Sequence, residues 1–307
     1  MRTEGKYNVV GLGELLWDVL PSGEQLGGAP ANFAYMTALL GDCGIIASRV
    51  GDDALGHEAL RRLEQTGLDI SHVQLNSAHP TGTVRVELDE KGGPTYRITE
   101  DVAWDYFEFV PDWQELAERA DAVCFGSLAQ RSRESRETIR TFLSATRDET
   151  VIVFDANLRR PFYSPEVLSE SLSLSNIAKL NDEELGTIVE LLDVGGASEE
   201  DSARRLLQSY DLQMVCVTRG ERGSLLVTDS TSAEHPGFKV DVADTVGAGD
   251  AFSAALVHHY LRGASLERIN DAANRLAAMV VTQVGATPAA GQSVLEQFVV
   301  RPSGGSL

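Results

Sequence analysis

One short segment combines residues that could bind an anion with a residue that could move a proton. In DTVGAGDAF, residues 244–252, Gly247, Ala248 and Gly249 come just before a helix-like run. Backbone N–H groups at a helix N-terminus lack internal partners and attract anions. Asp250 could then accept the proton of an attacking hydroxyl while these amides hold the charge that develops on a transferred phosphoryl group. Taken alone, Asp250 could equally be an ordinary helix cap.

A second glycine-rich segment could bind the molecule that carries the hydroxyl. In GGAPANFAYMTALLG, residues 27–41, Gly27 and Gly28 permit close backbone approach, and Pro30 suits the first turn of a helix. Asn32 would lie in that first turn, where its carboxamide can both donate to and accept from a ligand hydroxyl. A local cap is the alternative interpretation of Asn32.

Two common nucleotide-binding motifs are absent from the sequence. The segment GLGELL has Gly11 and Gly13, but Leu16 stands where a dinucleotide fingerprint needs a third glycine. The LLWDVLP run that follows resembles a strand and not the expected helix. The G-x-x-x-x-G-K-[ST] pattern of a Walker-type loop does not occur either. These observations argue against a nicotinamide, flavin or Walker-type nucleotide site.

Composition limits the classes of partner and compartment. The 307 residues carry a formal net charge of -20, which would repel polyanions, so we expect neither nucleic acid nor an anionic membrane as a partner. No apolar run approaches the ~18 residues of a membrane span, and the N-terminus lacks a secretory signal, so we expect a cytoplasmic protein. Cys43, Cys124 and Cys216 are far apart, which argues against a disulfide framework or a zinc site.

The elements that must position these residues alternate along the chain. Short apolar runs such as NVVGLG, TVIVFDAN and MVCVTRG are separated by helix-like stretches such as ALGHEALRRLEQTG. This alternation predicts an α/β fold with a mostly parallel central sheet flanked by helices on both faces. Ligand sites in such sheets lie at the carboxyl ends of the strands. We also expect a strand end at FKVD, residues 238–241, just before the first glycine-rich segment.

Residues 81–109 interrupt this alternation. The runs TVRVELD and PTYRITE alternate apolar and polar residues on either side of a Lys-Gly-Gly turn, which predicts a β-hairpin. Together with LLWDVLP near the start of the chain, the hairpin could form a small second sheet beside the main one. Such a sheet could cover a site or make a dimer contact, and a decorative edge hairpin is the alternative.

Five segments, in this order along the chain, resemble signatures of the ribokinase-like (PfkB) carbohydrate kinases. They are GGAPANFAYMTALLG, SRVGDDALG, NDEE, TRGERG and DTVGAGDAF, and GELLWDVLP near the start is similar to the fructokinase-like branch. The resemblance spans roughly residues 8–290. It implies one ribokinase-like α/β domain over residues 1–307, with a discontinuous β-sheet lid at approximately residues 14–26 and 82–108.

The resemblance also implies the reaction, which is transfer of the γ-phosphoryl group of ATP to a sugar hydroxyl. Asp250 would be the general base, and the amides of residues 246–249 would form the anion hole. Asp18, Gly28 and Asn32 would bind sugar hydroxyls. The nucleotide would be bound by Asn181, Thr218, Arg219, Gly220, Gly223 and Asn274.

Metal ions are implied in the same way. Glu184, in the N-x-x-E motif, would help to hold Mg²⁺ mainly through water. Asp244, with backbone oxygens around Val246, Val280 and Gly285, resembles a monovalent-cation site that could take K⁺. Ala289 stands where a serine is often found at that site, which puts K⁺ dependence in question.

Several substrates stay open at this point. D-fructose, giving fructose 6-phosphate, is the leading expectation from the fructokinase-like segments. 2-Keto-3-deoxygluconate is the alternative, because Arg97 and Arg159 could pair with a carboxylate, and nucleosides come third because Tyr96, Trp104 and Tyr106 could stack on a base. Ribose is disfavoured, since CFGSLAQRS has no acidic residue where the ribokinase branch has a glutamate. A sugar-sensing protein without catalytic activity is the alternative from another class, and we expect a homodimer through the lid.

Overall fold

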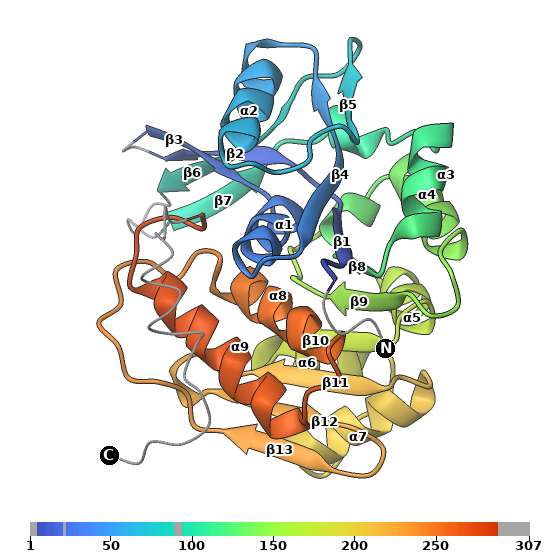
Figure 1. Cartoon of the computed structure of the whole chain (residues 1–307), viewed down its shortest axis with the longest axis vertical. Coiled ribbons are helices and arrows are strands. Elements are labelled where there is room, and N and C mark those ends of the chain that lie inside the picture. Colours follow the sequence, from blue (N-terminus) through green and yellow to red (C-terminus); the bar gives the residue numbers. More distant parts are fainter. Residues whose placement is uncertain (1–4, 21–22, 89–93, 288–307) are drawn as a thin grey trace.

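A nine-stranded sheet forms the centre of the molecule (Figure 1). The computed structural model of the chain describes residues 5–20, 23–88 and 94–287. In spatial order, the strands are β13 (Ser232–His235), β12 (Ser224–Val227), β11 (Met214–Thr218), β10 (Ile177–Asn181), β9 (Val151–Asp155), β8 (Ala122–Phe125), β1 (Asn8–Leu12), β4 (Cys43–Gly51) and β5 (Val73–Asn76). The strands from β11 to β5 run parallel, and β12 and β13 are antiparallel to their neighbours. The predicted mostly parallel sheet is therefore confirmed.

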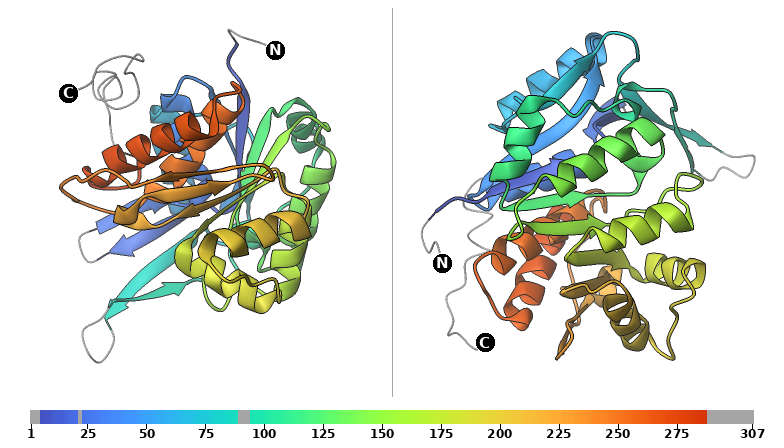
Figure 2. Two further views of the ribbon diagram at one scale, coloured as in Figure 1. Left: turned by 90° about the horizontal axis from the view of Figure 1, so that it is seen from below. Right: turned by 90° about the vertical axis from the view of Figure 1, so that its right-hand side faces the viewer.

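Helices cover both faces of this sheet (Figure 2). One face packs against α1 (Ala29–Leu39), α2 (Ala54–Gln65), α8 (Ala248–Tyr260) and α9 (Leu266–Val281). The other packs against α3 (Pro111–Arg119), α4 (Arg133–Ser144), α5 (Pro165–Ser173), α6 (Asp182–Leu191) and α7 (Glu199–Ser209). Neighbouring strand residues alternate between the two cores, as Val9 and Val10 do in β1. Burial on both faces explains why the parallel strands are nearly continuous apolar runs.

A separate four-stranded sheet projects from one side of the molecule (Figure 1). Its strands are β3 (Gly23–Gly27), β2 (Leu16–Leu20), β6 (Gly82–Leu88) and β7 (Pro94–Ile98), in that order. β6 and β7 pair antiparallel, which confirms the predicted hairpin, and LLWDVLP supplies β2. The predicted Lys-Gly-Gly turn, residues 91–93, lies outside the described residues.

The approach to DTVGAGDAF differs from the sequence prediction. No strand is present at residues 238–241, and the chain between β13 and α8 has no regular structure. Pro236 lacks a backbone N–H, and Gly237 has a φ of 80°, so the chain turns away after β13, the last strand of the sheet. Ala243 and Asp244 donate their amides to the carbonyl of Val281 at the end of α9 instead. The prediction of a strand here is wrong, and the approach is held by α9.

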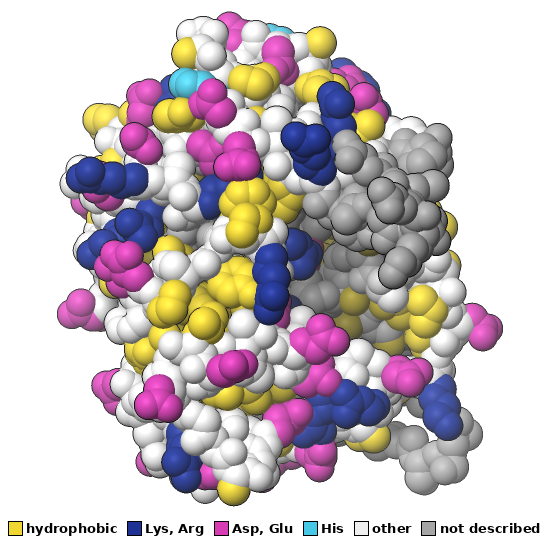
Figure 3. All heavy atoms as spheres, turned by 180° about the vertical axis from the view of Figure 1, so that it is seen from behind, with side chains coloured by type: hydrophobic (Ala, Val, Ile, Leu, Met, Phe, Trp, Pro, Cys, Tyr) yellow, Lys and Arg dark blue, Asp and Glu magenta, His cyan; other side chains and the backbone are white. Residues whose placement is uncertain are grey.

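Charged side chains of both signs are interspersed over the face seen in Figure 3, together with apolar ones. The molecule as a whole is strongly acidic, with a net charge of -20. Within the part of the chain that the structure describes, no helix combines the length and the apolar character that crossing a bilayer requires.

Candidate active site

The N-terminal turns of α1 and α8 meet through a hydrogen bond between side chains. Nδ2 of Asn32 donates to Oδ2 of Asp250 at 2.8 Å. Asn32 lies in the first turn of α1, where its amide donates to the carbonyl of Gly28 at 3.1 Å. Asp250 lies in the first turn of α8, but Gly247 occupies the N-cap position. The structure therefore brings the proposed base and a predicted sugar-binding residue into direct contact.

The turn before α8 is built for small residues. Gly247 has a φ of 81° and a ψ of -5°, in the left-handed region that favours glycine. A Cβ added there would lie 2.7 Å from Cα of Ala286, so the turn also packs closely against the segment after α9. Ala248 and Gly249 then begin the helix, at its partially positive end. Residues 247–249 thus have the position that the anion-hole hypothesis requires.

The pKa of Asp250 is raised from its ordinary 3.8 to about 6. Burial is the main cause and the charge of Asp155 adds to it, while the Asn32 hydrogen bond, Lys179 and Arg159 oppose the rise. A carboxyl with this pKa is ionised at neutral pH and is still a stronger base than an exposed aspartate. This is the protonation behaviour that a general base near pH 7 needs.

Glu14 is a second carboxyl in the same region, and sequence reasoning did not single it out as a site residue. It follows β1, its side chain is 3% exposed, and its Oε2 has no hydrogen-bond partner. Burial, with a contribution from Asp250, raises its pKa to about 7, against the opposing charge of Arg159. The signal in the sequence was an acidic residue directly after a buried strand, in GLGELL.

Asp18 and Arg159 lie near these carboxyls. Asp18 is in β2, and its Oδ2 would be 2.5 Å from a Cβ added at Gly27, so the side chain reaches the glycine pair that precedes α1. Burial raises the pKa of Asp18, and Arg159 opposes the rise. The charge of Arg159 therefore acts on Glu14, Asp18 and Asp250. Its side chain is exposed and donates to the carbonyl of Leu158 at 3.3 Å.

Gly28 and Arg97, two other predicted sugar-site residues, lie in different elements, at the start of α1 and in the small sheet. Gly28 is the N-cap of α1 with a φ of 115°, and a Cβ there would lie 2.4 Å from the carbonyl oxygen of Glu14. The glycine is thus required where the start of α1 passes the turn between β1 and β2. Arg97 is exposed on β7, across from Arg85 of β6 in the small sheet.

A buried ion pair under the first turn of α8 was also missed by sequence reasoning. Nζ of Lys179 in β10 lies 3.0 Å from Oδ1 of Asp155 in β9, and Ser253 of α8 donates to Oδ2 of Asp155 at 2.7 Å. Burial by itself would lower the pKa of Lys179, but Asp155 and Glu184 outweigh it and raise the pKa. Lys179 therefore stays charged.

The predicted Mg²⁺ residue Glu184 is already bound by backbone amides. It forms a capping box with Asn181 at the start of α6, in which each side chain accepts from the other residue's amide at 2.8 Å. The second oxygen of Glu184 accepts the amide of Leu158 at 2.8 Å. Among the described residues, no group of three or more Asp, Glu, His or Cys side chains could hold a metal ion by itself. A Mg²⁺ ion held through water and substrate phosphates fits this donor set better than a protein cage does.

The predicted nucleotide loop follows β11. Thr218 ends this strand in register with Asn181 of β10, and Gly220 begins a short 3₁₀ turn, Gly220–Arg222. Gly223 has a φ of 77°, and a Cβ there would lie 1.9 Å from the carbonyl of His235. The guanidinium of Arg219 pairs with Glu199 and Glu234 at 2.5 Å each. The structure thus places Thr218 beside Asn181 but holds Arg219 in ion pairs.

Asn274 takes part in a polar cluster between α9 and β12. Its Nδ2 donates to Oγ of Ser224 at 2.7 Å and to Oδ1 of Asn270 at 3.0 Å, and the side chain is buried. These bonds attach α9 to the sheet and occupy the donor group of Asn274. Its place near an adenine stays a prediction.

Two of the predicted cation-site residues, Val246 and Gly285, contact Asp244. One of its carboxylate oxygens accepts the amide of Val246 at 3.1 Å, and the other accepts the amide of Gly285 at 3.0 Å. Val280 is buried near the end of α9, while Ala289 lies outside the described residues. Asp244 thus connects the turn before α8 with the segment after α9.

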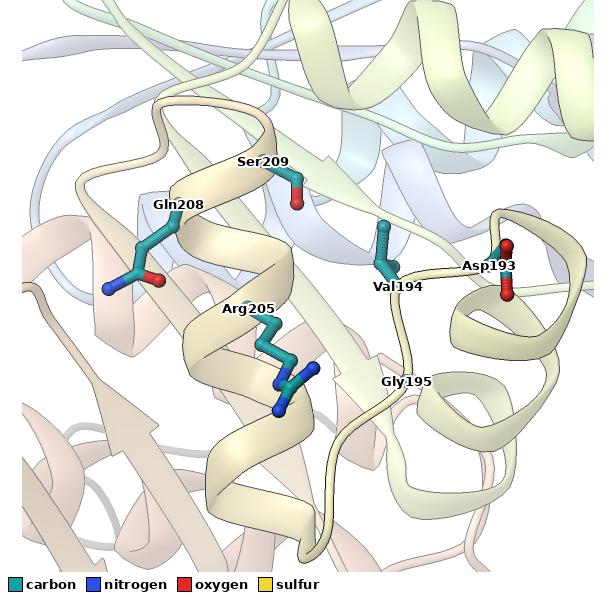
Figure 4. Close-up of a pocket in the computed structure, with 6 residues that line it drawn as sticks. All are labelled: Asp193, Val194, Gly195, Arg205, Gln208 and Ser209. Atoms are coloured by element: carbon teal, nitrogen blue, oxygen red, sulfur yellow. The ribbon is translucent and has the colours of Figure 1, made fainter.

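Two cavities differ in their relation to these residues. One, of about 430 Å³, is lined by β3, α1, α2 and residues 284–287, and it reaches Asn32 and Gly285. The other, of about 340 Å³, lies between the loop after α6 and helix α7, which contributes Arg205, Gln208 and Ser209 (Figure 4). None of the predicted site residues lines the second cavity, so it is separate from the candidate active site.

Comparisons with known proteins agree with this architecture. Residues 22–291 match the family described as pfkB family carbohydrate kinase. A fructokinase of Escherichia coli is 30% identical over 302 residues, which cover 91% of this chain and 94% of that protein.

Two solved structures cover nearly the whole chain. The uncharacterized sugar kinase PH1459 of Pyrococcus horikoshii, in complex with ATP, is 27% identical with a TM-score of 0.79, and the match covers 94% of this chain and 97% of that one. A double mutant of the fructokinase of Vibrio cholerae O395, bound to fructose, ADP and a potassium ion, is 25% identical with a TM-score of 0.81. That match covers 97% of this chain and 100% of the other.

Proposed function

Since this chain belongs to the pfkB family of carbohydrate kinases, we propose that it transfers the γ-phosphoryl group of ATP to the 6-hydroxyl of D-fructose. The observation that carries the proposal is the position of Asp250, held by Asn32 beside a glycine-rich helix N-terminus. An acceptor hydroxyl bound there would have a base on one side and the backbone amides of the helix N-terminus near the phosphoryl group on the other. That arrangement suits phosphoryl transfer, which depends mainly on positioning and charge stabilisation.

In the proposed reaction, Asp250 accepts the proton of the sugar hydroxyl while the hydroxyl oxygen forms a bond to the γ-phosphorus of ATP. The bond between that phosphorus and the bridging oxygen breaks, and ADP leaves. The amides of residues 247–249 stabilise charge on the transferred group. Asp18, Gly28 and Asn32 position the sugar, and Asn181 and the loop at residues 218–223 position the nucleotide.

Mg²⁺ is the metal that we propose for this site, and it would neutralise phosphate charge. Glu184 is the side chain that would hold it through water. Both oxygens of Glu184 already accept a backbone amide, so they point in fixed directions and each keeps a lone pair. Potassium is a further proposal. Asp244 and the backbone oxygens near Val246, Val280 and Gly285 would provide its site, and the fructokinase of Vibrio cholerae was solved with this ion.

Fructose is proposed as the acceptor because the relatives that match almost the whole chain include fructokinases. One observation favours an acidic sugar such as 2-keto-3-deoxygluconate as the second candidate. Arg159 is exposed beside three carboxyls, and the hydrogen bond that the structure shows for it goes to a neighbouring carbonyl. Its guanidinium is therefore available to a carboxylate of the substrate.

We also propose that the chain forms one ribokinase-like domain and that the small sheet acts as its lid and as a dimer contact. β2, the strand that carries Asp18, connects this sheet to the candidate site. The strands β3 and β7 lie at its two edges, and among the described strands none pairs with their outer sides, which could therefore pair with a second chain. A solution mass equal to one chain at micromolar concentration would contradict the dimer.

A coupled assay of ADP formation tests the proposed function, with fructose, ribose, 2-keto-3-deoxygluconate and adenosine as acceptors. We expect turnover with fructose and little with ribose or adenosine. Turnover with 2-keto-3-deoxygluconate in place of fructose would identify the second candidate. Sugar binding by calorimetry without turnover of any acceptor would contradict the kinase and favour a sugar sensor.

A further inference from the structure

We infer that Lys179 is a positioning residue for the proposed base, balancing the charge of Asp155 so that Asp250 stays ionised in the first turn of α8. The inference rests on the proposed function, in which Asp250 accepts a proton. The ammonium of Lys179 pairs with Asp155 and lies next to Gly249. Its effect on the reaction would therefore be exerted through Asp250.

The ion pair is buried among three elements. Lys179 is 7% exposed and Asp155 is 5% exposed, and they lie on the neighbouring parallel strands β10 and β9. Ser253, one helical turn after Asp250 in α8, donates to the second oxygen of Asp155. Asp155 is thus satisfied on both oxygens, by an ammonium from the sheet and a hydroxyl from the helix. With both oxygens bonded, the buried carboxylate of Asp155 can stay charged although burial alone would disfavour its charge.

The ammonium group also lies against the predicted anion hole. A Cβ added at Gly249 would be 2.8 Å from Nζ of Lys179, so any side chain at this position would have to displace the ammonium. The absence of a side chain at Gly249 therefore leaves space for the ammonium of Lys179. The same absence would let an anion approach the backbone amides of the turn. The ammonium of Lys179 thus lies next to the residue that directly precedes Asp250.

The choice of lysine is notable for this sequence. Only four of its 26 Lys and Arg residues are lysine, so arginine supplies most positive charges. An ammonium is compact and has three donors, whereas a guanidinium is a planar fork that needs more room. The narrow space between Asp155 and Gly249 suits the smaller group.

The groups that interact with Asp250 come from several neighbouring elements. These are Asn32 from α1, Glu14 from the turn after β1, Cys124 from β8, Asp155 from β9, Arg159 from the loop after β9, and Lys179 from β10. Asp155 disfavours the ionised form of Asp250, whereas Asn32, Lys179 and Arg159 favour it. Without Lys179, the carboxylates of Asp155 and Asp250 would share a poorly solvated site with one cation fewer to balance their charges.

Two substitutions with opposite effects test the inference. In Lys179→Met the cation is lost, so the acidic limb of the profile of kcat/KM against pH should move up by about one unit or more. In Asp155→Asn the neighbouring negative charge is lost while the lysine stays, so the limb should move to lower pH. Loosened packing alone would lower activity in both variants without moving the limb in opposite directions. Lys239→Met, at an exposed position, is the matched control and should leave the profile unchanged.

Equal shifts in both variants, or an unchanged limb in Lys179→Met, would overturn the inference. If Lys179→Met does not fold, as judged by circular dichroism, Lys179→Gln removes the same charge with a polar side chain, and the same upward shift is expected. If no sugar is turned over by the parent protein, the proposed function fails separately. The ionisation of Asp250 can then be followed by carboxyl ¹³C NMR, assigned with Asp250→Asn, and the same opposite shifts are expected in its titration.

Discussion

Asn32 and Asp250 are joined by a 2.8 Å hydrogen bond although 218 positions separate them in the sequence. The bond brings the first turn of α1 against the first turn of α8, and it favours the ionised form of Asp250. A residue predicted to bind the sugar thus also contacts the proposed base. In the proposed function, binding of the acceptor and activation of its hydroxyl would therefore be coupled through Asn32.

Replacing Asp250 with asparagine tests the base. The substitution preserves size and can still bond to Asn32, but an amide does not accept the hydroxyl proton. We expect kcat to fall by about 10²- to 10⁴-fold, with sugar and ATP affinity largely retained in calorimetry. Asp241→Asn makes the same change at an exposed position on the approach to α8 and should keep parental kcat. A kcat for Asp250→Asn within threefold of the parent would rule out this base.

Replacing Gly247 with alanine tests the turn before α8. The new Cβ would collide with Ala286 and would require a left-handed backbone that alanine disfavours. We expect kcat to fall at least tenfold as the amides of the turn move, together with a lower melting temperature. Gly186→Ala is the control, because it lies inside α6 with open space around its Cβ. That variant should keep its activity and gain about 0.5–1 kcal/mol of stability.

Glu14→Gln tests the buried carboxyl. The folded pKa of about 7 lies above the ordinary 4.5, so the folded chain binds this proton more tightly than the unfolded chain does. The free energy of unfolding of the parent should therefore fall as pH rises from about 4.5 to about 7, and glutamine removes this loss. At pH 8 we expect the variant to be more stable, by an amount on the order of 3 kcal/mol.

Urea unfolding of both proteins between pH 4 and pH 8 measures this difference. Glu64→Gln, an exposed change in α2, should follow the parent at every pH. Parallel curves for Glu14→Gln and the parent would show that burial does not shift the pKa of Glu14.

Asp42→Asn tests a charge cluster away from the site. The Asp42 side chain is fully buried and accepts a hydrogen bond from the backbone amide of Tyr7. It also accepts from Nη2 of Arg262 at 2.7 Å and pairs with Nδ1 of His258 at 2.7 Å. Despite the opposing effect of burial, its bonds with His258, Arg262 and Tyr7 lower its pKa to about 2. The stability that it contributes should be complete above pH 3.8 and lost as pH falls towards 2.

At pH 7 we expect Asp42→Asn to lower the free energy of unfolding by about 3–5 kcal/mol, because His258 and Arg262 lose their buried partner. Glu137→Gln is the control, since its pair with Arg133 is exposed and solvent screens it, so its loss should change stability little. Urea titration measures both. A cost for Asp42→Asn as small as that of the control would contradict a stabilising role of the cluster.

The fold class was predictable because it depends on local patterns. Buried parallel strands are short apolar runs, and the alternating arms of residues 81–109 show a sheet with one exposed face. The strand expected at residues 238–241 was wrong for a non-local reason. A strand needs a partner, and after the edge strand β13 the chain bonds to α9 instead. Local composition contains no information about which partner is available.

For the candidate site too, some features follow from local sequence and others depend on the tertiary structure. The sequence by itself determined the glycine-rich helix starts, the carboxylate of Asp250 and the family, because these are encoded in contiguous segments. Only the tertiary structure decided that Asp250 meets Asn32, and that Glu14, Asp155 and Lys179 form its charged surroundings. Lys179 in IAKLN was a signal, as a charge inside an apolar strand, but its partner was not visible. Desolvation and Coulomb interactions act through space, so a pKa is set by neighbours that only the folded chain brings together.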